Sequence, residues 1–298
     1  MGLVLLPTRR WADARQDWQA LEDAGFDHGW TYDHVNWDPV AGQPWFGAVP
    51  TLAAASTTTS RAGVGALVFS PNLHHPVTLA QDLVTLADIA GGRFVAGVGA
   101  GGTRADSRML GQPRLTPAAR TERLAEFVGL LRLLLTQGHA DVRGRWFDAV
   151  EARCVPSREH GVTVPLAIAA NGPRTLELAV QHGDAWVTDG RLEGSGSSRQ
   201  AFRDGVAGLS ERFRETCERL GRPPEQMARI MLLSVDPEQP FAEPGGLLEA
   251  CAAYAQMGFT DVVVYPKRAR AAFDAPSRAF QHALAEELPL ARQLRPAP

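Results

Sequence analysis

Short apolar runs alternate with longer amphipathic segments along most of the chain. The short runs are rich in Val, Ile, Leu and Ala, as buried strands are, and they predict strands over residues 3–6, 28–32, 63–69, 93–98, 165–169, 185–188, 230–235 and 262–265. The longer segments carry apolar residues at helical spacing, and they predict helices over residues 11–24, 49–59, 77–89, 118–136, 174–182, 198–220, 247–257 and 277–288. The pattern therefore predicts eight strands, each followed by a helix.

This alternation predicts an α/β protein with a parallel sheet. A doubly wound sheet and a closed barrel both fit it. The count of strands and the length of 298 residues, without a linker that divides the chain, favour one (β/α)8 TIM barrel domain over residues 1–298. Residues 33–48 and 138–164 exceed the usual loop length, and we expect extended loops at the carboxyl-terminal face of the barrel.

Composition narrows the classes of partner. The 30 basic residues are outnumbered by 33 acidic residues, for a formal net charge of −3, so the chain lacks the basic excess that binds a nucleic-acid backbone. No apolar run reaches the roughly 18 residues that a membrane span needs. The three cysteines have neither metal-ligand spacing nor an even count. We expect a cytoplasmic protein that acts on a small molecule and binds no metal, nucleic acid or membrane.

Functional residues of a barrel follow the carboxyl ends of its strands. Asp33 and His34 follow the second predicted strand and are candidates for an acid–base pair. The alternative is a loop histidine that caps neighbouring backbone. Trp37 and Trp45 lie farther along the same loop, where they would either line an aromatic cofactor or substrate, or pack the loop.

The turn after the fifth predicted strand is the strongest candidate for an anion site. Asn171, Gly172, Arg174 and Thr175 surround Pro173, a residue that suits the first turn of a helix. Small residues let a phosphate approach the backbone N–H groups, and Arg174 adds positive charge. The alternative is an ordinary turn in which Asn171 caps the helix.

Several motifs in order resemble the bacterial-luciferase-like flavin and deazaflavin oxidoreductases over nearly the whole chain. They are AGFDH (24–28) with YDH (32–34), GALVFSP (65–71) with HP (75–76), GGRF (91–94) with GVGAG (97–101), and PLAIAANGP (165–173) with GDA (183–185). The family fold is a (β/α)8 barrel, so the resemblance implies the fold that the alternation favours.

The resemblance also implies a cofactor, because the Asp-His pair and the AANGP turn are more similar to the branch that uses coenzyme F420 than to the FMN-dependent monooxygenases. It implies that Asp33 and His34 contact the deazaflavin ring, that His34 serves proton transfer with Asp33 orienting it, and that a cis peptide joins Leu67 and Val68 behind the ring. The other implied cofactor contacts are Ser70, Ala100, Gly101, Ala170, Asn171, Gly172, Arg174 and Thr175.

One position departs from the F420-dependent glucose-6-phosphate dehydrogenases of this branch. Gly102 stands where those enzymes have a glutamate that serves as the acid–base group, and oxidation of an alcohol requires a base at the substrate hydroxyl. Their substrate-phosphate lysines lack a clear match, since Lys267 is the only lysine; Lys267, Arg191, Trp37 and Trp45 are the candidate substrate contacts.

The sequence therefore predicts an F420-dependent reductase that transfers a hydride from reduced F420 to an imine or activated alkene. The alternative is an FMN-dependent monooxygenase that uses reduced FMN and oxygen. A third interpretation, a barrel that binds a cofactor or partner without catalysis, is disfavoured by the presence of Asp33 and His34. The resemblance implies a homodimer.

Overall fold

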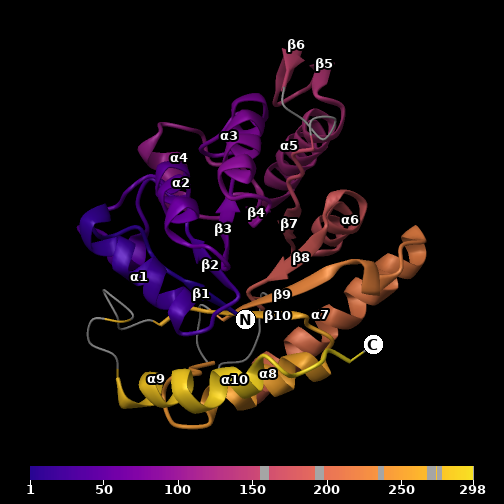
Figure 1. Ribbon diagram of the computed structural model, residues 1–298. Coiled ribbons are helices and arrows are strands. Elements are labelled where there is room, and N and C mark those ends of the chain that lie inside the picture. The colour runs from indigo at the N-terminus through magenta and orange to yellow at the C-terminus, as the bar shows by residue number, and fades with distance from the viewer. Residues whose placement is uncertain (155–160, 192–197, 234–237, 267–272, 274–276, 298) are drawn as a thin grey trace.

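A computed structural model describes residues 1–154, 161–191, 198–233, 238–266, 273 and 277–297. Eight parallel strands close into a barrel in the order β1-β10-β9-β8-β7-β4-β3-β2, with helices around it (Figure 1). The barrel strands are β1 (Gly2–Val4), β2 (His28–Thr31), β3 (Gly63–Phe69), β4 (Phe94–Val98), β7 (Leu166–Ala169), β8 (Ala185–Thr188), β9 (Ala228–Leu233) and β10 (Asp261–Val264). The predicted (β/α)8 barrel is confirmed, and the predicted strand over residues 230–235 begins at residue 228.

Several of the helices that cover the barrel begin at a proline or after a polar residue that caps the helix. Pro76, Pro117 and Pro173 occupy the first positions of three helices, where the missing N–H costs nothing, and the Thr116 hydroxyl accepts a hydrogen bond from the Ala119 N–H at 3.2 Å. The helices are α1 (Trp11–Asp23), α2 (Ala48–Thr58), α3 (Pro76–Ile89), α4 (Arg104–Met109), α5 (Pro117–Gln137), α6 (Pro173–His182), α7 (Arg199–Leu220), α8 (Gly246–Gln256), α9 (Arg278–His282) and α10 (Leu288–Ala291).

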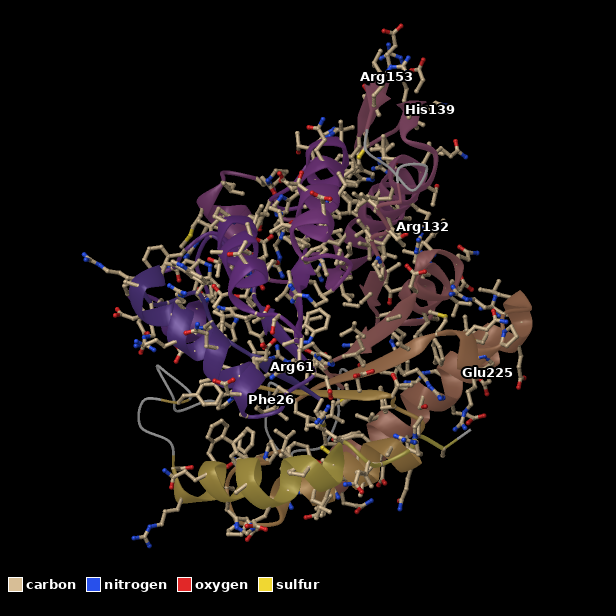
Figure 2. The ribbon with its side chains drawn as sticks, in the orientation of Figure 1. Phe26, Arg61, Arg132, His139, Arg153 and Glu225 are labelled. Atoms are coloured by element: carbon tan, nitrogen blue, oxygen red, sulfur yellow. The ribbon has the colours of Figure 1, made fainter. Side chains whose placement is uncertain are left out.

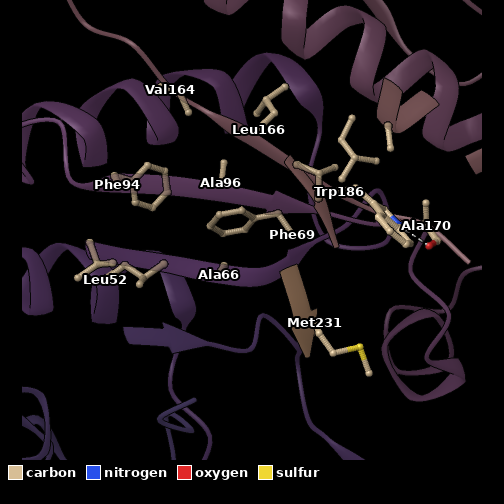
Figure 3. Packing of buried hydrophobic residues seen from close by; sticks show 14 of the residues in the cluster. Leu52, Ala66, Phe69, Phe94, Ala96, Val164, Leu166, Ala170, Trp186 and Met231 are labelled. Atoms are coloured by element: carbon tan, nitrogen blue, oxygen red, sulfur yellow. Dashed lines mark hydrogen bonds between the residues drawn. The ribbon is translucent and has the colours of Figure 1, made fainter. Parts of the chain in front are cut away.

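Two apolar cores lie on opposite sides of the barrel wall, because successive side chains of a strand point to opposite faces. Leu3 belongs to the larger core between strands and helices, and its neighbour Val4 belongs to the smaller core inside the barrel. Figure 3 shows part of the larger core, where Trp186 of β8 is fully buried. The Trp186 indole N–H donates to the Ala170 carbonyl at 2.9 Å. This contact joins the core to the turn that follows β7.

A β-hairpin lies within residues 138–164, which the sequence analysis treated as a loop. β5 (His139–Arg143) pairs antiparallel with β6 (Asp148–Arg153), and the hairpin projects outside the barrel helices (Figure 1). The Glu126 carboxylate of α5 accepts the N–H groups of Arg145, Trp146 and Phe147, which holds the hairpin turn against the helix. The pattern missed the hairpin because most of its side chains are exposed, so neither strand carries an apolar face.

A polar network occupies the amino-terminal end of the barrel. His28 Nε2 lies 2.9 Å from Asp261 Oδ1, and the Trp30 indole N–H donates to His28 Nδ1. Burial raises the pKa of the Asp261 carboxyl, but the hydrogen bond and charge of His28 and the charge of the Met1 amino group outweigh it and lower the pKa to about 2. The ionised carboxylate therefore stabilises the fold above its unfolded pKa, and this contribution is lost as the pH falls through about 2.

Asp261→Asn is expected to lower the free energy of unfolding at neutral pH by about 2 kcal/mol, the size that a pKa shift of about two units carries. Since the stabilisation requires the ionised carboxylate, the gap between the two proteins should narrow as the pH falls from about 4 toward 2. Urea unfolding followed by circular dichroism at several pH values measures this gap. A gap that stays constant over that range would show that the carboxylate charge does not contribute.

Candidate active site

Two aspartate–histidine pairs lie at the carboxyl-terminal end of the barrel. Asp33 lies two residues after the end of β2 and is 7% exposed. Its Oδ2 lies 2.6 Å from Nε2 of His74, which is in the loop between β3 and α3. His34 Nδ1 lies 2.7 Å from Oδ2 of Asp106 in α4. The expectation that Asp33 orients His34 is wrong. Adjacent side chains of an extended segment point apart, so each residue of the pair contacts a different loop.

His74 and Asp106 contact the predicted pair and were not among the candidate site residues that the sequence predicts. They lie 41 and 72 positions from their partners, and no local spacing encodes such contacts. A signal for His74 was available, because it lies between the end of β3 and the helix start at Pro76, in the part of a barrel where functional residues gather. Asp106 is 1% exposed. It lies in a short helix that the sequence pattern does not predict, so the sequence gives no sign that this side chain is buried.

Aromatic rings gather beside His34. The rings of Trp37 and Tyr32 are 5.2 Å apart, those of Trp37 and Tyr265 are 5.8 Å apart, and Trp45 lies 6.0 Å from His34, as measured between ring centroids. The structure therefore brings both predicted tryptophans to the same side as His34 and adds Tyr32 and Tyr265. Burial raises the pKa of the Tyr265 hydroxyl, so this side chain is neutral at physiological pH.

The strand β3 departs from regular pairing at the predicted position. The peptide bond between Leu67 and Val68 is cis, and the pairing of β3 with β4 shifts between Ala66 and Phe69. Val68 is half-buried, and a Cβ on Gly99 of the neighbouring strand end would lie 2.6 Å from its side chain. Gly99 is therefore required for the β4 loop to approach Val68.

The loop after β4 rests on a buried asparagine. Gly101 has φ of +70°, and a Cβ there would meet the Asn72 carboxamide at 2.5 Å. The Asn72 amide donates to the Gly101 carbonyl at 3.1 Å and its oxygen accepts from Arg123. Ser70 is buried close by in sequence, and Ala100 is half-buried. The predicted cofactor contacts of β3 and β4 therefore belong to two neighbouring loops tied by Asn72.

In the turn after β7, which the sequence predicts to bind an anion, the Asn171 side chain is hydrogen-bonded within the protein. The Asn171 amide donates to Asp189 Oδ1 at 2.8 Å and to the Arg191 carbonyl at 3.1 Å, and its oxygen accepts from Thr188. This side chain therefore ties the β7 turn to the β8 loop. The first intrahelical hydrogen bond of α6 runs from the Leu176 N–H to the Gly172 carbonyl at 2.9 Å, so the N–H groups of Arg174 and Thr175 precede it.

The remaining candidates differ in how far the structure describes them. Arg191 is exposed and its Nε lies 3.3 Å from Asp189 Oδ2, so a neighbouring carboxylate already balances its charge. Ala170 is buried, and Gly172 precedes the first turn of α6. Lys267 lies outside the described residues. Among the residues that the structure describes, no group of three or more His, Cys, Asp or Glu side chains could hold a metal ion, and no helix there is long and apolar enough to cross a membrane.

Known proteins share both the sequence pattern and the fold. An F420-dependent glucose-6-phosphate dehydrogenase of Beutenbergia cavernae is 31% identical over 61% of this chain and 52% of its own length. A 4-hydroxyprotoasukamycin monooxygenase of Streptomyces nodosus subsp. asukaensis is 32% identical over 60% of this chain and 47% of its own length. The chain thus spans about half the length of these relatives.

The solved structure of an F420-dependent secondary alcohol dehydrogenase, in complex with an F420–acetone adduct, superposes with a TM-score of 0.77 and covers 98% of this chain and 99% of that one at 18% identity. At that identity the likeness shows the fold, which is the same closed barrel. A family model described as luciferase-like monooxygenase matches residues 2–236. The chain belongs to the luciferase-like monooxygenase family.

Proposed function

We propose that this protein is an F420-dependent oxidoreductase that transfers a hydride from reduced F420 to an imine or activated alkene of a small metabolite. The observation that carries the proposal is the pair of separate aspartate–histidine contacts at one end of the barrel, Asp33 with His74 and His34 with Asp106. The F420-dependent relatives support the choice of cofactor. Under this proposal the two pairs have different tasks.

The donor groups of the site fit this cofactor. A phosphate group needs N–H donors and positive charge, and the first turn of α6 offers both through Thr175 and Arg174. A flat ring needs a close backbone approach, and the irregular pairing of β3 with β4 at Val68, with no side chain at the neighbouring Gly99, supports such an approach. When bound, reduced F420 supplies the hydride.

The protein's own residues position the reactants and move the proton. Asp33, buried against His74, lies where the resemblance places the ring. His34 uses Nδ1 for Asp106 and so has Nε2 left for a substrate proton. Trp37, Trp45 and Tyr265 surround this side with apolar rings, which favour a neutral or aromatic substrate over a phosphorylated one.

Reduction of an unsaturated acceptor is favoured over oxidation of an alcohol. Gly102 offers no carboxylate base, so oxidation of an alcohol would need His34 as the base, whereas we assign His34 to donate a proton. We expect cyclic imines or enoyl compounds to oxidise reduced F420. The increase in the absorbance of oxidised F420 measures this reaction. Rapid F420 reduction by glucose 6-phosphate, without turnover of any unsaturated acceptor, would contradict the direction that we propose.

The second candidate function is an FMN-dependent monooxygenase, because one relative at 32% identity carries a monooxygenase name. Absorbance titrations of the purified protein with F420 and with FMN separate the two. The proposed function requires that the protein bind F420 more tightly than FMN. Tighter binding of FMN, with oxygen consumption after its reduction, would favour the monooxygenase.

Arg174→Ala is expected to weaken F420 binding by roughly 1–3 kcal/mol, because the exposed guanidinium at the start of α6 would lose a charge-assisted contact with the phosphate. Arg15→Ala is the matched control, an exposed arginine on α1. Fluorescence titration gives both dissociation constants. An unchanged constant for Arg174→Ala would place this side chain away from the cofactor.

The proposal includes a cytoplasmic homodimer. The resemblance implies a dimer, and α2 presents the half-buried Ala53 and Ala54, whose small side chains allow a second helix to approach closely. Light scattering on the purified protein measures the mass of the assembly. A mass of one chain at micromolar concentration would contradict the dimer.

A further inference from the structure

We infer that Asp106 is a positioning residue that fixes the tautomer of His34, so that His34 Nε2 is the nitrogen that delivers the proton to the substrate. The inference rests on the proposed function for its chemistry. Its structural part, the tautomer, concerns the protein without any cofactor. The two parts therefore can be tested separately.

Both oxygens of the Asp106 carboxylate accept hydrogen bonds from one loop. Oδ1 accepts the Val35 N–H at 2.9 Å, and Oδ2 lies 2.7 Å from His34 Nδ1. Asp106 is 1% exposed and its neighbour Ala105 is 2% exposed, so α4 inserts this carboxylate into the protein beneath residues 34 and 35. Two contacts to consecutive residues fix the imidazole in position as well as in direction.

The proton count follows from these contacts. An ionised carboxylate is an acceptor only, so the hydrogen of the His34 contact belongs to Nδ1. Nε2 then carries a lone pair in the neutral ring and a second proton in the imidazolium, which is the form that can donate a proton to the substrate. This is the arrangement by which a buried aspartate orients a catalytic histidine in hydrolases.

In the proposed reaction the substrate carbon receives the hydride with both its electrons from the reduced cofactor, which is oxidised. The C=N double bond becomes a single bond, and the substrate nitrogen takes the proton from His34 Nε2. His34 is left neutral. Oxidation of the cofactor also releases one proton, and this proton returns to His34 through water. Atoms and charge balance without a further reductant.

The other histidine of the site presents the opposite nitrogen. His74 uses Nε2 for Asp33, so its remaining nitrogen is Nδ1, and its ring meets Phe69 edge to face at a centroid distance of 5.5 Å. The two histidines therefore differ in which nitrogen a carboxylate holds. His34 is the one that stands beside the rings of Tyr32 and Trp45, so we assign the substrate proton to its Nε2.

The tautomer can be measured directly in the cofactor-free protein. Long-range 1H–15N correlation spectra at a pH where imidazole is neutral are expected to show His34 protonated at Nδ1. In Asp106→Asn the new amide can donate to Nδ1, so the spectrum should move toward the Nε2-protonated form. An Nε2-protonated His34 in the unsubstituted protein would overturn the inference, whether or not the variant folds.

Activity then tests the catalytic part. Asp106→Asn is expected to lower kcat for the acceptor reduction by roughly 10–10³-fold, with KM changed by less than about threefold. In a His34→Gln background the same change should have almost no further effect, because the group that it positions is gone. Losses that multiply in the double variant would mean a merely structural role and would overturn the inference.

Asp261→Asn is the control, since Asp261 also contacts a histidine, His28 through its Nε2, but at the opposite end of the barrel. It should leave the His34 spectrum and the rate unchanged at a temperature where the variant is folded. If neither the unsubstituted protein nor Asp106→Asn oxidises reduced F420, the proposed function fails. The His34 spectrum still decides whether Asp106 fixes the tautomer.

Discussion

His34→Ala is expected to slow the oxidation of reduced F420 by an imine acceptor by about 10²–10⁴-fold, the usual contribution of a positioned acid–base group. The side chain removed is the one whose Nδ1 contacts Asp106 and whose ring stands beside Trp45. Stopped-flow absorbance measures the single-turnover rate. The dissociation constant of F420 should change far less than the rate, because the phosphate contacts that we propose are on α6.

His139→Ala is the control for this prediction. Figure 2 shows His139 on the outer hairpin, remote from the barrel, where its ring contacts only the Gln137 carbonyl among the hydrogen bonds of the described residues. Its rate should equal that of the unsubstituted protein. A rate loss below tenfold in His34→Ala would mean that His34 only contacts the deazaflavin ring and that water donates the proton.

Trp186→Ala is expected to lower the free energy of unfolding by about 3–5 kcal/mol, the range for truncation of a buried aromatic side chain. Trp186 is 0% exposed, stacks on Phe213 at 4.6 Å and 12°, and lies 5.4 Å from Phe259. Its truncation removes these contacts and the hydrogen bond to Ala170 together. Urea unfolding monitored by circular dichroism gives the loss.

Trp186→Phe separates packing from the hydrogen bond. It keeps a ring against Phe213 but leaves the Ala170 carbonyl without its indole donor, at an expected loss of about 1–3 kcal/mol in the free energy of unfolding. F420 binding should also weaken, since Ala170 precedes the turn that we propose to bind the phosphate. Leu290→Ala, at a side chain that is 50% exposed, should change little. A loss under about 1 kcal/mol in Trp186→Ala would mean that the outer core repacks around the cavity.

The sequence predicts the barrel because its strands are buried on both faces. Strands such as 63–69 and 185–188 therefore appear as unbroken apolar runs bounded by turn residues, which is what single-sequence patterns detect best. The sequence pattern does not predict the hairpin of residues 139–153, because most side chains of both its strands face solvent. An exposed strand has no apolar pattern to reveal it.

The sequence predicts where the candidate site residues lie, but it does not predict which side chains they contact. Asp33, His34 and the residues of the β7 turn stand where barrel strands end, so the chain order alone located them. Which carboxylate meets which imidazole depends on how α4 and the β3 loop pack, and this is a tertiary property. Asn171 illustrates the same limit, because its amide binds Asp189 and the Arg191 carbonyl across the neighbouring loop.

Closure of the barrel joins the two ends of the chain, because β1 pairs with β10 as well as with β2. During synthesis the open edge of β1 therefore has no partner until residues 261–264 have left the ribosome. Contacts that distant in sequence form slowly, and an unpaired strand edge is a template for association with other chains. Truncation before residue 261 is thus expected to yield aggregates instead of a smaller folded barrel, and the solubility of such fragments during expression measures it.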